Sequence, residues 1–277
     1  MSVEALSQVP AVAAPARPGL GRLSLAVFKR ELRNFVHTPG TYVALAFFLL
    51  LAGALFVLIL SDYCEASAKV QAGTSLPADE VPLNVNDRIV TQLFSALNFL
   101  AIFLTPMLTM RLVAEERRTG TFELLVSTPL GNWGILLGKF AAALAVGLVV
   151  LAVTGIYPAI VAHFAQPEWG VVASCYIGMF LILAAYTAFG VLASTLAESQ
   201  IAAVVLGFVG LLVFQMTGWL FKSGHLGVVA AALSIRQHSE NFTRGIVAAS
   251  DVAYFVLFTF FSLYLAAQVL DRRRWRA

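Results

Sequence analysis

The sequence is poor in charged residues and nearly lacks cysteine. Only 12% of its 277 residues are charged, and Cys64 and Cys175 are its two cysteines. Soluble proteins average about 25% charged residues, so this composition excludes an ordinary soluble domain. Two cysteines also exclude a disulfide framework. A single bridge between them is geometrically open, although a buried or free thiol is the simpler interpretation.

Catalytic and metal-binding signatures are missing as well. The four histidines are scattered, without the spacing that brings metal ligands together. The run from Gly134 to Phe140 resembles a phosphate-binding loop, but it has too few residues between its glycines and Phe140 stands where Ser or Thr is required. No Gly-x-Ser-x-Gly motif occurs. We therefore expect no enzyme, and no metal or cofactor bound by this chain.

What the sequence does contain is long apolar runs. Hydrophobic residues make up 60% of the chain, and the mean hydropathy is +0.85. A helix of about 20 apolar residues crosses the hydrocarbon core of a bilayer, where backbone groups must pair internally. The sequence predicts an all-α integral membrane protein whose six transmembrane helices run near Thr41 to Leu60, Thr91 to Leu112, Ile135 to His163, Val171 to Ser194, Ile201 to Phe221 and Val252 to Leu270. The third span is long, and Gly155 and Pro158 predict a kink near its far end.

The distribution of basic residues predicts the orientation. In the six-span scheme, thirteen of the eighteen Lys and Arg residues fall on the side that holds both termini. Basic residues concentrate on the cytoplasmic side of a membrane, so both termini are expected there. The positive net charge then reflects topology and anionic lipid rather than binding to nucleic acid.

The N-terminal region divides into two parts. Residues 1–21 are rich in Ala and Pro and are expected to be a disordered cytoplasmic tail, followed by one membrane domain over residues 22–277. From Arg22 to Phe35 apolar and basic residues interleave, which predicts a helix lying on the inner membrane surface. The alternative is a solvated extension of the first span, but Pro39 and Gly40 interrupt the chain before that span.

The middle of each predicted span contains no Asp, Glu, Lys or Arg. An ion-coupled carrier usually needs such a group, so this class is disfavoured and the energy is expected to come from outside the chain. The polar residues that remain are explained either by hydrogen bonds between helices or by the lining of a pathway. The candidates for pathway lining are Asn98, Thr105, Thr109, Tyr157, Tyr186 and Gln215.

A charged segment from Arg111 to Lys139 separates the second and third spans. It cannot lie in hydrocarbon, so we interpret it as a docking surface for a soluble partner. At its end, Gly134 and Gly138 predict close packing of helices at the start of the third span.

The run RLVAEERRTGTFELL, from Arg111 to Leu125, resembles the segment after the second span of type-2 ABC-transporter permeases. Three further runs are similar to the gliding-motility, GldF-like branch of that family. They are PEWG at Pro167 to Gly170, LAESQ at Leu196 to Gln200 and SENFTRG at Ser239 to Gly245. The similarity covers about residues 22 to 275.

This resemblance implies two permease copies, or a pair of related permeases, with two cytoplasmic ATPase subunits that carry ATP and Mg²⁺. Residues from about Ala114 to Trp133 would form a cytoplasmic coupling helix, with Glu198 as a second contact. The alternative is a solvated loop with self-paired charges. The implied coupling residues are Glu115, Glu116, Arg117, Arg118, Thr119, Gly120, Phe122, Glu123 and Leu124.

The expected function is therefore the membrane subunit of an ABC exporter in a bacterial inner membrane. The rival is a scaffold that does not transport but passes ATPase-driven motion to an extracytoplasmic protein. The segment from Lys222 to Asp251 would form re-entrant helices by resemblance, or an ordinary surface loop. Ser61 to Arg88 would be a loop suited to an accessory protein.

The orientation has a direct test. A reporter fused at Ser75 is expected on the outer side of the membrane, because the loop that contains it carries few basic residues. Labelling with a reagent that does not cross the membrane checks this, and cytoplasmic labelling would contradict the six-span scheme.

Overall fold

The computed structural model describes residues 20–73, 84–118, 120, 132–220, 230 and 232–274. All regular secondary structure in these ranges is helical, which confirms the all-α prediction. The elements are α1 (Leu20–His37), α2 (Pro39–Gln71), the π-helical turn η2 (Asn86–Val90), α3 (Thr91–Thr109), α4 (Arg111–Arg118), α6 (Asn132–Val153), α7 (Ile156–Phe164), α8 (Trp169–Leu196), α9 (Gln200–Leu220), α11 (Ile235–Thr243) and α12 (Ala249–Arg274).

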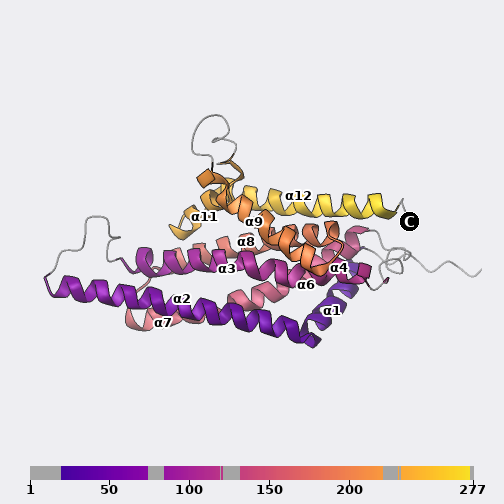
Figure 1. The fold of residues 1–277 in the computed structure, drawn as a ribbon. Coiled ribbons are helices and arrows are strands. Elements are labelled where there is room, and N and C mark those ends of the chain that lie inside the picture. Colours follow the sequence, from indigo (N-terminus) through magenta and orange to yellow (C-terminus); the bar gives the residue numbers. More distant parts are fainter. Residues whose placement is uncertain are drawn as a thin grey trace, which may run out of the picture.

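Six stretches of the described chain are long and apolar enough to cross a membrane. They match the six predicted spans in order, and the helices that form them run side by side (Figure 1). The prediction of a multi-pass membrane protein is therefore confirmed. The stretches are Pro39–Gln71, Asn86–Glu116, Trp133–Phe164, Trp169–Leu196, Gln200–Gly218 and Ala249–Arg272.

Helix α2 differs from the sequence prediction, which ended the first span at Leu60. The helix continues through Ser61 to Gln71 and ends before Gly73, which has a φ of 78°. The added turns contain good helix formers such as Ala, Glu and Lys and contain no Pro or Gly, so nothing stops the helix at the end of its apolar stretch. This extension carries α2 beyond the other helices (Figure 1).

The third span is broken where a kink was predicted. Helix α6 ends at Val153 and α7 begins at Ile156. The Gly155 N–H turns back to the Ala152 carbonyl at 3.1 Å instead of continuing the α-helical pattern. Pro158 lies in the first turn of α7, where a missing N–H costs little.

Helices α3 and α8 form the core of the bundle. In the apolar windows, 67% of the residues of the α3–α4 and α8 spans are buried, against 22% for α2 and α9. Helix α8 buries small residues such as Ala185, Ala188 and Ala193, which let the neighbouring helices approach closely. The remaining spans surround this pair and expose apolar side chains suited to lipid.

Helix α1 packs along the first half of α6, with Val27 and Phe35 buried and Lys29 exposed. A Cβ atom at Gly138 of α6 would lie 2.7 Å from Val27 Cβ and 2.8 Å from the Ser24 carbonyl oxygen. The absence of a side chain at Gly138 therefore permits this contact, which confirms close packing at that predicted glycine. The chain turns sharply at Thr38 into α2 (Figure 1).

The bundle has two distinct ends. Helices α1 and α4 and the last turn of α12 lie at one end, which we name the proximal end, and α11 lies toward the other, distal end (Figure 1). Phe242 of α11 packs against Gly178 of α8, where an added Cβ would lie 2.6 Å from its ring. Asp251 of α12 pairs with His238 Nδ1 at 2.7 Å and accepts from Asn241 Nδ2 at 2.7 Å, which fixes α11 to α12.

We expect Gly138→Ala to destabilise the protein by about 1–3 kcal/mol, because α1 would have to move away from α6. Thermal unfolding of the purified protein measures the effect. Gly147→Ala is the matched control on the same helix, since its Cβ would lie 3.9 Å from Leu183. Equal melting temperatures for the two variants would contradict the tight α1–α6 contact.

Candidate functional site

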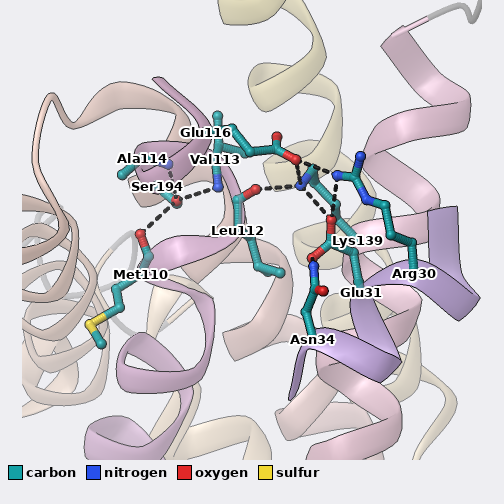
Figure 2. A network of polar contacts seen from close by, with 10 residues as sticks. All are labelled: Arg30, Glu31, Asn34, Met110, Leu112, Val113, Ala114, Glu116, Lys139 and Ser194. Atoms are coloured by element: carbon teal, nitrogen blue, oxygen red, sulfur yellow. Dashed lines mark hydrogen bonds and ion pairs between the residues drawn. The ribbon is translucent and has the colours of Figure 1, made fainter. Parts of the chain in front are cut away.

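A buried lysine organises the proximal end. Lys139 of α6 is only 1% exposed. Its Nζ lies 2.9 Å from Glu31 Oε1 of α1 and 2.9 Å from Glu116 Oε1 of α4, and it donates a third hydrogen bond to the Leu112 carbonyl (Figure 2). All three ammonium hydrogens are therefore used. This one side chain joins three helices.

Arg30 completes the cluster. Its Nη2 lies 2.8 Å from Glu31 Oε1 and also pairs with Glu116 (Figure 2). Arg30, Glu31, Glu116 and Lys139, which we name the proximal ion cluster, carry balanced charge. Burial alone would raise the pKa of the Glu31 carboxyl, but Lys139 and Arg30 outweigh it and hold this pKa below its ordinary value of 4.5. Glu31 is therefore ionised at neutral pH.

The start of α4 is held from the opposite side by Ser194 of α8. Its Oγ accepts from the Val113 N–H at 3.1 Å and the Ala114 N–H at 3.2 Å, and donates to the Met110 carbonyl at 3.1 Å (Figure 2). The first N–H groups of a helix lack partners within it. Ser194 thus supplies, from another helix, the cap that α4 needs after the break at Met110.

Arg111 anchors α4 to the first two helices. Its guanidinium lies over the Phe35 ring of α1, 5.0 Å from the centroid, and donates to the Thr41 hydroxyl at the start of α2. Together with the ion cluster and Ser194, this contact fixes α4 to α1, α2, α6 and α8. The chain that leaves α4 at its C-terminal end therefore starts from a rigid base.

The structure describes part of the predicted coupling segment. Glu115 and Glu116 lie on α4, and Arg117 and Arg118 form its last residues. Gly120 adopts a φ of 70°, which favours glycine. The other predicted coupling residues, Thr119, Phe122, Glu123 and Leu124, lie outside the described residues.

Glu198 is exposed in the turn between α8 and α9. The same turn contributes Ala197 to a small buried cluster with Ala114 of α4 and Ala203 of α9. The two regions predicted to contact an ATPase therefore adjoin each other at the proximal end.

The candidates for pathway lining fall into two groups. Asn98, Tyr186 and Gln215 form one hydrogen-bonded cluster, in which the Tyr186 hydroxyl lies 2.8 Å from Asn98 Oδ1 and 3.3 Å from Gln215 Oε1. The others lie in helix packing. Thr105 and Thr109 are buried and donate to carbonyls of their own helix, and Tyr157 stacks on Phe56 and donates to the Leu49 carbonyl at 3.4 Å.

Sequence reasoning did not find the proximal ion cluster. It counted Arg30 and Lys139 among the thirteen basic residues that indicate the orientation in the membrane, and it gave Glu31 no role. Two signals were present in the sequence. Glu31 is the lone acidic residue in the basic stretch from Arg22 to His37, and Lys139 follows three apolar residues and a glycine at the start of a span. A lysine in such a position needs a nearby acid.

The described chain is thus a six-span helical membrane protein in which the polar helix α4, at the proximal end, is fixed to four other helices. The sequence model of the ABC-2 family transporter proteins matches residues 25–244. This range covers most of the chain, so the protein belongs to that family of transporter membrane subunits. Among curated proteins no match was found.

Replacing Lys139 by Met would remove the buried one of the two cations that pair with both Glu31 and Glu116, and would leave only the half-exposed Arg30. Removing one partner of a buried ion pair costs about 3–5 kcal/mol, so we expect a large loss of thermal stability in the purified protein. Adding Glu31→Gln and Glu116→Gln to Lys139→Met is expected to recover much of the loss. Lys29→Met, on the exposed side of α1, is the control. A Lys139→Met protein as stable as this control would contradict the importance of the cluster.

Proposed function

We propose that this chain is the permease subunit of an ABC exporter and that a separate cytoplasmic ATPase binds the segment from Ala114 to Trp133. ATP and Mg²⁺ would be bound by that partner. The observation that carries the proposal is the anchoring of α4, since a helix at the base of the segment is fixed to four others within a chain of the ABC-2 family. A rigid base is what a docking segment needs in order to transmit force.

The route of the force follows the contacts of α4. A push on the segment reaches α3 through the short connection at Met110, α6 through Lys139 and α8 through Ser194. Because Lys139 and Ser194 are buried and hold α4 by ion pairs and hydrogen bonds, separating α4 from α6 and α8 is costly. Closure of the ATPases would therefore tilt spans rather than bend the segment alone.

In this proposal the proximal end faces the cytoplasm of a bacterium, as the distribution of basic residues predicts. Two copies, or this chain with a related permease, would form a pathway between them. Export and the relation to the gliding-motility branch are supported by the sequence resemblance. Neither depends on the geometry of α4.

A second candidate is the scaffold that passes motion to an extracytoplasmic protein. The observation that favours it is the polar extension of α2 from Ser61 to Gln71, which projects about 15 Å beyond the apolar stretch. Such a projecting helix is a suitable contact for an accessory protein. Both candidates share the same ATPase contact and differ only in what is moved.

The test is purification of the chain from its native membrane, followed by an ATPase assay in lipid. We expect an ATPase subunit to co-purify. Phe122→Asp combined with Leu124→Asp is expected to reduce its recovery at least about tenfold, because apolar anchors carry most of the energy of such interfaces. Val247→Asp, at an exposed apolar position of the distal end, is the control.

Absence of an ATPase from the intact wild-type complex would contradict the proposal, as would full recovery with the double variant. Reconstituted vesicles then separate the two candidates. ATP-dependent movement of a substrate supports the exporter, whereas an ATP-dependent change in the affinity for an outer protein without transport supports the scaffold.

A further inference from the structure

A pocket of about 290 Å³ lies near the distal end, between α3, α8, α9 and α11. We name it the distal pocket. Its polar wall contains Asn98, Gln215 and Ser239, each less than 10% exposed. Asn98 Nδ2 approaches Ser239 Oγ at 3.5 Å, and Asn98 Oδ1 accepts from the fully buried Tyr186 hydroxyl. Polar side chains that hydrogen bonds hold in place therefore form one wall of the pocket, inside an otherwise apolar bundle.

This wall has hydrogen-bonding capacity to spare. Tyr186 has one hydroxyl proton, but two amide oxygens lie within 3.3 Å of it. Asn98 Oδ1 is the nearer acceptor, and the 3.3 Å contact with this hydroxyl is the one side-chain hydrogen bond of Gln215 among the described residues, so the Gln215 amide group can still bond to a ligand. A buried polar group gains by finding a partner. A ligand that offers both donors and acceptors would supply it.

The pocket is electrically neutral. The charged residues that line it are Arg236 and Glu240 of α11, which pair with each other at 3.4 Å and are both exposed. Neither sign of charge is favoured inside. The volume is at the lower end of the range for small-molecule sites, about 300–1,000 Å³, so it suits a single compact group.

An apolar groove adjoins the distal pocket. It has a volume of about 380 Å³ and lies between α2 and α3, where Phe47, Leu51, Phe103 and Met107 line it. We name it the α2–α3 groove. Phe99 belongs to the walls of both the pocket and the groove. The residues Ser95, Phe99, Phe103 and Met107 form the exposed stripe of α3, which is about 18 Å long.

A neutral polar pocket beside an apolar groove is complementary to an amphiphilic molecule with an uncharged polar headgroup. We propose that the two together bind one membrane lipid whose headgroup is uncharged and carries hydroxyl groups, such as a glycosyl diacylglycerol. The headgroup contacts Gln215 and Ser239 in the distal pocket, and one acyl chain lies along Phe99, Phe103 and Met107. Binding at this site needs no ATPase, so it can be tested separately from the proposed function.

The test uses the purified full chain in nanodiscs of phosphatidylethanolamine and phosphatidylglycerol. The probe is a glucosyl diacylglycerol with a photoreactive diazirine in its acyl chain. The comparator is a phosphatidylglycerol with the same chain, whose headgroup also has hydroxyls but is charged. We expect the neutral probe to label the ranges 99–107 and 47–51 several-fold more strongly than the charged lipid does.

Variants of the polar wall complete the test. Gln215→Met and Ser239→Ala are each expected to weaken labelling about fivefold, which corresponds to one lost hydrogen bond. Thr217→Val is the control, because Thr217 donates to the Val213 carbonyl of its own helix and does not line the pocket. Size-exclusion chromatography verifies that each variant is folded. Equal labelling by the two lipids, or labelling unchanged in both folded wall variants, would overturn the proposal.

Discussion

The buried ammonium group of Lys139 is the constraint on which the proximal end depends. A lysine that is 1% exposed loses nearly all of its hydration, and this loss is tolerable only with acids at close range. The acids come from α1 and α4, at 2.9 Å each. Helix α1 therefore cannot leave the bundle surface without exposing or unpairing charge. It is an amphipathic helix as the sequence predicts, but one fixed to α6 as well as suited to a membrane surface.

Helix α4 is also held by contacts outside the ion cluster. Its first N–H groups bond to Ser194, and Arg111 lies over Phe35. Removing the ion cluster alone would still leave α4 attached to α8 and α1. Removing Ser194 alone would leave it attached to α6. Because the contacts come from four helices on different sides, α4 is attached to the bundle at several points, and the ion cluster is one of these attachments.

The sequence predicted those features that depend on local pattern. The six spans follow from the length of apolar runs, and the break in the third span follows from Gly155 and Pro158. Features that join distant residues were missed, since Glu31 and Lys139 are 108 positions apart and no spacing rule relates them. The extension of α2 was missed for another reason. Hydropathy marks where a span leaves the bilayer, whereas helix formers such as Ala66 and Ala68 allow the helix to continue past that point.

Helices α3 and α8 connect the two polar regions of the bundle. The α3–α4 stretch carries Asn98 at the distal pocket and Leu112 at the ion cluster, about 21 Å apart along a helix axis. Helix α8 likewise carries Tyr186, which donates to Asn98, and Ser194, which holds the start of α4. A tilt of α3 against α8 that begins at α4 therefore changes the distance between Asn98 and Tyr186. If the distal pocket binds lipid more tightly in one tilt than in the other, then lipid binding and force at α4 must influence each other equally, since coupling between two sites is reciprocal.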